Sequence, residues 1–363
     1  MKRAVFVTNH YWDSHRKAGF HWLADAFWRA GWHVLFFTES ISWVSWLRRD
    51  QRFTYPMFRE AGWLRPVRDR MLSYVWLTPF HPVNFRNRLL NRLSAPLLSL
   101  YGKFPYTEAE AEIAKADLFV FDSDHGLFLF DRFKQQNPAA RFVYRVSDDI
   151  PMLQHHPIVL QNEERVAPRF DLLSVPCDYI QRRFSYLPQV ILQKHGLRKE
   201  LFDAPSKNPY QGNGPFFIFV GKNYFDLDFL KRALRVFPEA AFHVFGAIAD
   251  LPTAPNLHAY GERPFVEMIP YLKHAHVGLQ AMSYCPGAEC LTDSLKMHQY
   301  TYCRLPIVAP EFLRHDRPHV FYYQPGNDDS IRQALQSALE FDRDAIPTAT
   351  VLSWDDIAVR MAG

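Results

Sequence analysis

The chain has 363 residues, of which 48% are apolar and 22% charged, and its formal net charge is +4 at pH 7. This composition excludes a disordered chain, and the length is sufficient for two domains that each have a full hydrophobic core. No window of 18 or more apolar residues occurs, so no transmembrane helix is expected. A secretory apolar region is also absent, so the four cysteines are expected to be reduced thiols in the cytoplasm.

The first half of the chain alternates between predicted strands and helices. Phe20, Leu23, Ala24 and Phe27 have the spacing of one helix face and predict a helix over 17–30. Short apolar runs are typical of parallel strands that are covered on both faces. They predict strands at 4–8, 33–38, 118–122, 142–145, 172–175 and 190–193.

A basic, aromatic segment interrupts this pattern at 41–106. Its eleven cations outnumber its three acids, so the segment carries about +8 and the rest of the chain about −4. Arginine interleaved with tryptophan suits the headgroup region of an anionic membrane. An ordinary solvated face is the plain alternative, and nucleic-acid binding is disfavoured because no known motif accompanies the charge. The cations are Arg48, Arg49, Arg52, Arg59, Arg65, Arg68, Arg70, Arg86, Arg88, Arg92 and Lys103, and the tryptophans are Trp43, Trp46, Trp63 and Trp76.

A Pro/Asn/Gly-rich stretch at 199–215 predicts a linker between a first domain at 1–198 and a second at 216–350. The second domain again alternates, with strands expected at 216–220, 241–245, 257–260, 277–280, 307–309 and 320–323. Helices are expected at 228–236, 265–274 and 328–341, and residues 351–363 are expected to pack back on the first domain. The pattern predicts an α/β protein with two doubly wound, Rossmann-like domains.

In such sheets, ligands bind beyond the carboxyl ends of the strands. Asp148 and Asp149 follow one strand, and one of them can accept a proton from an attacking hydroxyl, unless it only caps the next turn. Gly221-Lys222-Asn223 follows another strand, where glycine permits close approach to a ligand. Glu262 follows a third strand and can accept hydrogen bonds from ribose hydroxyls.

The segment Cys290–Tyr300 predicts a helix start with N-cap residues and a cation, Lys296, in its first turns. Helix starts attract phosphate, so a diphosphate is the expected ligand. Asp122-Ser-Asp124 and Asp226-Leu-Asp228 match a metal-binding Asp-x-Asp pattern, which is too short to be specific. Walker and Gly-x-Gly-x-x-Gly motifs are absent, and this argues against kinases and nicotinamide dehydrogenases.

Several blocks resemble the xanthan-type (GumK-like) glucuronosyltransferases of glycosyltransferase family 70. The similarity runs through both halves of the chain in the same order, including Trp354-Asp355 near its end. The matching blocks are Asn137–Asp148, Tyr271–Gly278 and Asp293–Tyr300.

The resemblance implies a GT-B enzyme, with two Rossmann-like domains that face a cleft. It implies inverting, metal-independent transfer of glucuronic acid from UDP-glucuronate to a polyprenyl-diphosphate-linked oligosaccharide in exopolysaccharide biosynthesis. The implied location is the cytoplasmic face of the plasma membrane, as a peripheral protein, with no cofactor and no nucleic-acid partner. Asp148 matches the general base. The residues expected to bind the donor are Lys296, Glu262, Gln299, Gly221, Lys222, Asn223, Asp226, Arg263, Met282, Ser294 and Leu295, and the acceptor-side or membrane-facing set is His21, Asp25, Trp63, Arg65, Arg68, Trp76 and His81.

This chain departs from the family at some of these positions. The family has Met where Asn223 and Arg263 stand, Tyr at Met282, an acid at Arg198 and Gly at Asp149. Arg263 or Lys222 can still pair with a uronate carboxylate, so a uronic donor is the leading expectation. The alternatives are a UDP-sugar transferase with another donor, a nucleotide-sugar epimerase, and a non-catalytic sugar-binding protein.

Overall fold

The computed structural model describes residues 1–14, 17–47, 57–212 and 214–363. The chain forms two compact units, one of residues 1–194 and 354–363 and the other of residues 195–353. Arg48, Arg49 and Arg52 of the basic, aromatic segment lie outside the described residues.

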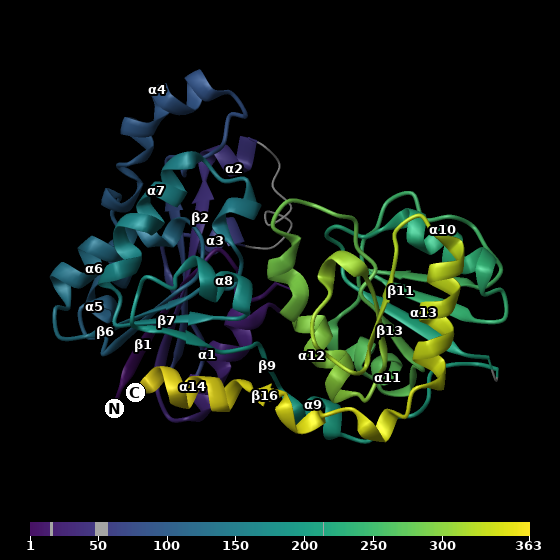
Figure 1. Ribbon diagram of the computed structural model, residues 1–363. Helices are drawn as coiled ribbons and strands as arrows, with labels where there is room; N and C mark the ends of the chain where they lie inside the picture. The colour runs from purple at the N-terminus through teal and green to yellow at the C-terminus, as the bar shows by residue number, and fades with distance from the viewer. Residues whose placement is uncertain (15–16, 48–56, 213) are drawn as a thin grey trace. The chain divides into compact units, whose positions relative to one another are not determined.

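The first unit is built on an eight-stranded sheet in the order β3-β4-β2-β1-β5-β6-β7-β8 (Figure 1). Neighbouring strands are parallel except for β3 and β4, which are antiparallel. The six strands predicted for this half are confirmed, whereas β3 and β4 are not predicted by apolar runs. The strands are β1 Arg3–Thr8, β2 His33–Ser42, β3 Leu64–Arg68, β4 Met71–Thr78, β5 Leu118–Phe121, β6 Arg141–Arg145, β7 Leu172–Val175 and β8 Val190–Leu192.

Helices cover the faces of this sheet, which explains why β5 is apolar and buried at every position. The predicted face of α1 is confirmed, because Phe20, Leu23, Ala24 and Phe27 are all buried. The helices are α1 Gly19–Arg29, α2 Trp43–Leu47, α3 Met57–Glu60, α4 Arg88–Leu98, α5 Glu110–Ile113, α6 Phe130–Gln136, α7 Pro157–Val166 and α8 Asp178–Arg183, with short 3₁₀ turns that include η2 Tyr101–Lys103, η4 His125–Leu129 and η5 Ile150–Leu153.

The basic, aromatic segment contributes α4, a helix with an unusual apolar surface. Asn87 caps its start by accepting hydrogen bonds from the Leu89 and Leu90 amides. Asn91 and Ser94 contact His156 at the start of α7, so this side of α4 faces the unit. The leucines on its other side remain exposed to between 40% and 68%, namely Leu89, Leu90, Leu93, Leu97 and, just beyond the helix, Leu100.

The second unit contains a six-stranded sheet in the order β12-β11-β10-β13-β14-β15, and all of its pairs are parallel. In chain order this is the 3-2-1-4-5-6 arrangement of nucleotide-binding folds, and the order reverses between β10 and β13. The strands are β10 Phe216–Val220, β11 Ala241–Phe245, β12 Leu257–Gly261, β13 Val277–Leu279, β14 Ile307–Pro310 and β15 Val320–Tyr323. The helices are α9 Lys199–Asp203, α10 Leu227–Val236, α11 Phe265–His274, α12 Leu295–Tyr302 and α13 Asp328–Glu340.

The chain passes between the units at two places. It leaves the first unit after Lys194, so residues 199–215, which composition marks as a linker, belong to the second unit and include α9. It returns at Trp354, where α14 (Trp354–Ala362) packs on α1. A Cβ on Gly19 would lie 2.9 Å from the Trp354 ring, so glycine is needed there to admit the indole.

Among the described residues, no helix has both the length and the apolar character that crossing a bilayer requires.

Candidate active site

In the second unit, the carboxyl end of β10 lies at the point where the strand order reverses. Gly221 follows β10 with φ +147°, and Gly246 follows β11 with φ +140°. A Cβ on Gly246 would lie 1.8 Å from the Gly221 carbonyl oxygen, so the two strand-end turns touch through bare backbone.

Lys296, in the first turn of α12, reaches the same place. Its Nζ lies 3.2 Å from the position of a Cβ on Gly221 and 4.4 Å from the centroid of the Phe219 ring. The predicted helix start is therefore next to the predicted glycine turn, although 75 positions separate Lys296 from Gly221. The Lys296 ammonium thus has a cation–π contact with Phe219 beside the glycine turn.

The start of α12 has no side-chain cap. Ser294 stands at the N-cap position, but its hydroxyl accepts no hydrogen bond from the first turn; it lies 3.3 Å from Gln280 Nε2 instead. The preceding loop is anchored by Asp293, which is buried, pairs with Arg317 and lies 3.7 Å from His298. The amides of the first turn are thus positioned to bind an anion.

The other predicted donor residues fall into two groups. Lys222, Asn223, Glu262 and Arg263 are exposed at strand ends, where a ligand can reach them. Asp226, Met282 and Gln299 are buried. The Asp226 carboxylate caps α10 through the Phe229 amide at 3.0 Å, so for Asp226 the structure shows a capping task instead of a ligand contact.

In the first unit, Asp148 lies on the turn that follows β6 and is exposed. Its backbone amide donates to Ser123 Oγ at 2.9 Å, and Ser123 follows the neighbouring strand β5. Asp122 lies beside it and accepts a hydrogen bond from Thr8 Oγ1 at 2.7 Å. Burial raises the pKa of Asp122 to about 7, and the Asp148 charge contributes in the same direction. The exposed Asp148 carboxylate therefore lies beside the buried Asp122, whose raised pKa favours its protonated form.

The Asp149 side chain, unlike that of Asp148, points into the protein, where it has a charged partner. Its side chain is buried and accepts from Arg183 Nη1 at 2.8 Å, while Arg183 also pairs with the buried Glu163. Burial raises the pKa of Asp149 although Arg183 opposes the shift. Asp149 fixes the turn that carries Asp148.

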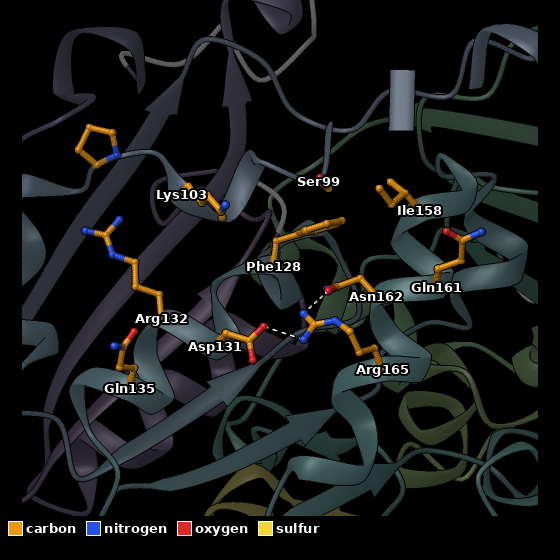
Figure 2. A pocket seen from close by; sticks show the side chains of 12 residues that line it. Ser99, Lys103, Phe128, Asp131, Arg132, Gln135, Ile158, Gln161, Asn162 and Arg165 are labelled. Carbon is orange, nitrogen blue, oxygen red and sulfur yellow. Dashed lines mark hydrogen bonds and ion pairs between the residues drawn. The ribbon is translucent and has the colours of Figure 1, made fainter. Parts of the chain in front are cut away.

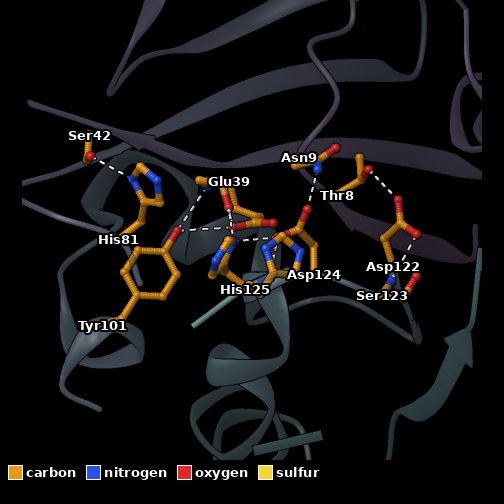
Figure 3. A network of polar contacts seen from close by, with 12 residues as sticks. Thr8, Asn9, Glu39, Ser42, His81, Tyr101, Asp122, Ser123, Asp124 and His125 are labelled. Carbon is orange, nitrogen blue, oxygen red and sulfur yellow. Dashed lines mark hydrogen bonds and ion pairs between the residues drawn. The ribbon is translucent and has the colours of Figure 1, made fainter. Parts of the chain in front are cut away.

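A buried polar network continues from Asp122 along the ends of β1, β2 and β5 (Figure 3). Burial opposes ionisation of Asp124, but its contact with His125 holds the pKa of this carboxyl well below its usual range and raises that of His125. Glu39 is also buried, which raises its pKa to about 7, and it accepts from Tyr101 at 3.0 Å. His81 joins the network through Ser42 Oγ at 2.7 Å.

Three members of this network are the candidates for a metal site. Asp124, His125 and His155 bring one potential ligand atom each within 4.8 Å of the others. Asp124 already accepts hydrogen bonds from Asn9 and from the His125 amide, and its carboxylate also contacts the His125 ring. A metal would have to displace these contacts.

The N-terminal part of the chain matches a family model. Residues 6–176 match the model described as "Glucuronosyltransferase GumK, N-terminal domain". The matched residues lie in the first unit, which is therefore similar to this domain. Over 360 residues the chain is 28% identical to the UDP-glucuronate:glycolipid 2-beta-glucuronosyltransferase of Xanthomonas campestris pv. campestris, which covers 98% of this chain and 88% of that protein.

Solved structures match this chain over its whole length. Sucrose-phosphate synthase from Thermosynechococcus elongatus has a TM-score of 0.68 at 14% identity and covers 100% of this chain and 98% of its own. Anabaena HepE in complex with UDP-glucose has a TM-score of 0.64 at 11% identity, with the same coverage of both chains. The predicted GT-B class, with two Rossmann-like domains, is confirmed by these structural matches.

The residues predicted for the acceptor side or the membrane surface have different environments in the first unit. His81 is in the polar network and Trp63 is 66% exposed. For Trp76 the prediction is wrong, because the ring is fully buried and its N–H donates to the Pro105 carbonyl at 2.8 Å. Arg65 pairs with Asp13 and with Glu60.

His21 and Asp25 are buried and have structural contacts. Both His21 ring nitrogens are used, toward Tyr11 O at 2.8 Å and the Ala18 amide at 3.0 Å, and burial lowers its pKa well below the usual value. Asp25 is buried and pairs with Arg29 at 3.1 Å and Arg68 at 2.5 Å. A helix face alone does not distinguish such buried polar residues from ligand contacts.

Sequence reasoning missed Ser123 and Gly246 and interpreted Asp122 only as part of a metal pattern. Ser123 supports the Asp148 turn, and Asp122 adjoins it. The signal was present, because both residues directly follow the apolar run 118–121 and so lie at the carboxyl end of a strand. Gly246 likewise follows β11.

Proposed function

We propose that the protein transfers glucuronic acid from UDP-glucuronate to a polyprenyl-diphosphate-linked oligosaccharide, with inversion at the sugar carbon and without a metal. The observation that carries this proposal is the convergence of Lys296, the uncapped start of α12 and the Gly221 turn at the switch point of the second unit. The Xanthomonas relative is a UDP-glucuronate:glycolipid transferase, and this supports the choice of donor and of lipid acceptor.

In the proposed reaction, the second unit holds the donor. Lys296 and the α12 amides neutralise the charge that develops on the departing UDP, where preorganised donors contribute most to the rate. Glu262 accepts hydrogen bonds from the ribose, and exposed Lys222 or Arg263 pairs with the uronate carboxylate. The described residues give Lys222 no hydrogen-bond or ion-pair partner of its own.

The first unit presents the acceptor. Asp148 accepts the proton of the attacking hydroxyl, and direct attack from the opposite side of the sugar carbon produces inversion. The contacts of Asp149 and Ser123 hold the turn so that Asp148 remains exposed. The proposal assigns no role to a divalent ion because Lys296 and the helix start supply the positive charge that a metal would otherwise provide.

The lipid-linked acceptor implies attachment to a membrane, and α4 supplies a surface for it. The exposed leucines of α4 lie next to Arg88 and Arg92, and no Asp or Glu occurs between Asp69 and Glu108. Apolar insertion combined with uncompensated cations is what peripheral attachment to an anionic membrane requires.

Donor binding tests the proposal at the point where the chain departs from its family. A thermal-shift panel should show stabilisation by UDP and UDP-glucuronate. Replacing Lys296 with methionine should weaken UDP binding at least tenfold, since a charge-assisted contact to phosphate is lost. Lys231→Met, which removes an exposed lysine of α10, is the matched control. Equal UDP affinity in the two variants would count against the diphosphate role of Lys296.

A further inference from the structure

The first unit contains a pocket that the transfer reaction does not use. It has a volume of about 710 Å³ and lies between the turn η2, the end of η4 and the helices α6 and α7 (Figure 2). Phe128 and Ile158 provide apolar lining, and a Cβ on Gly102 would lie 2.0 Å from the Phe128 carbonyl oxygen. Glycine at 102 is therefore required for the close packing of η2 on η4 beside the pocket. The volume is in the range of sites that bind small molecules.

The lining has an excess of positive charge. Lys103, Arg132 and Arg165 contribute cations, and Asp131 is the one acid among the lining residues. Asp131 is already paired with Arg165 at 2.7 Å and Arg169 at 2.5 Å, so it does not neutralise the other two. The Lys103 side chain is exposed, and the described residues give its ammonium group no ion-pair or hydrogen-bond partner.

The pocket is also preorganised to donate hydrogen bonds. The Arg132 guanidinium is held 3.8 Å from the centroid of the Tyr106 ring, donates to the Phe104 carbonyl at 2.9 Å and lies 3.8 Å from a Glu110 carboxylate oxygen; its five N–H groups exceed these contacts. Asn162 is 6% exposed and turns its oxygen to Arg165 at 2.7 Å, while its buried Nδ2 has no hydrogen-bond partner among the described residues. A buried donor without a partner is costly unless a ligand satisfies it.

The pocket continues the apolar surface of α4. Ser99, the residue that ends α4, lines the pocket, and Leu97 and Leu100 on either side of it are 55% and 40% exposed. A lipid chain that lies on the leucines of α4 would therefore bring its head group to Ser99 and Lys103. Apolar surface that leads into a cationic pocket matches a lipid with a negatively charged head.

We propose that this pocket binds the anionic phosphate of a membrane lipid, with Lys103 and Arg132 on the phosphate and Asn162 as a further donor. The inference rests on the proposed attachment to a membrane and gives it a specific binding site. Arginine and lysine are the residues that recognise phosphate, and the pocket holds both. An anionic phospholipid and a polyprenyl phosphate present the same chemistry to it.

Vesicle sedimentation tests the site with three compositions: phosphatidylcholine alone, phosphatidylcholine with phosphatidylglycerol, and phosphatidylcholine with polyprenyl phosphate. The full-length protein should bind one or both anionic vesicles more tightly than phosphatidylcholine alone. Lys103→Glu should reduce the affinity for anionic vesicles about fivefold or more, given the contribution of a single lysine near a charged surface. Gln161→Trp, which fills the pocket from its exposed rim without a change in charge, should reduce it as well.

Lys115→Glu is the matched control, because Lys115 is exposed in the same unit but does not line the pocket. If Lys103→Glu and Gln161→Trp lose the preference for anionic vesicles and Lys115→Glu keeps it, the result would support phosphate binding in the pocket. If Gln161→Trp binds anionic vesicles as tightly as the unaltered protein, the proposal is overturned, since a diffuse basic surface would then explain the binding. The two anionic compositions identify the source of the phosphate, and equal binding to all three would overturn the proposal.

Donor binding separates this inference from the proposed function. Thermal shift by UDP-glucuronate should be the same in Lys103→Glu, Gln161→Trp and the unaltered protein. If no UDP-sugar stabilises any of them while the lipid result holds, the proposed transfer fails and the pocket remains supported.

Discussion

At the scale of single residues, the turn after β6 shows how two adjacent carboxylates acquire different tasks. Asp148 is exposed, whereas Asp149 is buried against Arg183. The sequence alone indicates an acid at a strand end, and the family resemblance selects Asp148. Neither reveals the partner of Asp149, because Arg183 lies 34 residues further along the chain and only the packing of α8 brings it close.

The two carboxylates provide a matched pair of substitutions. Asp148→Asn should lower kcat for transfer by roughly 10²–10⁴-fold, the usual contribution of a general base, and leave UDP binding unchanged. Asp149→Asn should instead lower the free energy of unfolding by about 1–3 kcal/mol, since Arg183 loses part of a buried pairing. Kinetics and chemical denaturation of both variants test this division, and undiminished transfer by Asp148→Asn would eliminate Asp148 as the base.

The buried Asp122 should leave a signature in the pH dependence of stability. Its pKa is about 7 in the folded protein and about 4 in an unfolded chain. Between these values the unfolded state releases a proton that the folded state keeps, so stability falls as pH rises through the window. Asp122→Asn cannot titrate and should gain stability relative to the unaltered protein from pH 4 to pH 7.

Chemical denaturation at several pH values measures this difference. Asp69→Asn is the control, because the Asp69 side chain is 83% exposed. A constant difference between Asp122→Asn and the unaltered protein across the window would contradict the raised pKa.

At the scale of elements, apolar runs predict the parallel strands well because such strands are buried on both faces. The strands at 172–175, 216–220 and 241–245 begin and end at the predicted residues. β3 and β4 escape the same reasoning, since β3 contains Arg65, Pro66 and Arg68 and is an edge strand. The helix α4 lies in the basic, aromatic segment, for which no helix is predicted, and the structure leaves its leucines exposed.

The helix α14 joins the last residues of the chain to the first unit, and Trp354 is the contact that should matter most. Trp354→Ala should lower the free energy of unfolding of this unit by about 3–5 kcal/mol, since the ring is 2% exposed and packs on Gly19. Val359→Ala, at a position of the same helix that is 70% exposed, should change stability little. Chemical denaturation of both variants tests this, and equal effects would show that α14 does not depend on its buried face.

At the scale of the whole molecule, each unit supplies one part of the proposed chemistry: phosphate binding in the second and proton transfer in the first. The first unit also carries the apolar face of α4. The double substitution Leu93→Glu with Leu97→Glu should abolish flotation with anionic vesicles, because two exposed leucines are replaced by charges that the membrane repels. UDP binding should be unchanged, and flotation that persists would exclude α4 as the membrane contact.

Chelation tests the proposal that transfer needs no metal. Activity should survive EDTA, since Lys296 and the start of α12 supply the positive charge at the diphosphate. A loss of activity that Mg²⁺ or Mn²⁺ restores would direct attention to Asp124, His125 and His155, the cluster that could hold an ion.

The most direct test of the account is transfer itself, measured with the purified protein, a membrane extract that contains lipid-linked oligosaccharides, and labelled UDP-glucuronate or UDP-glucose. The account predicts that label from UDP-glucuronate enters the lipid-extractable fraction, that label from UDP-glucose does not, and that Asp148→Asn abolishes the incorporation. Incorporation from UDP-glucose instead, or equal incorporation by Asp148→Asn, would contradict it.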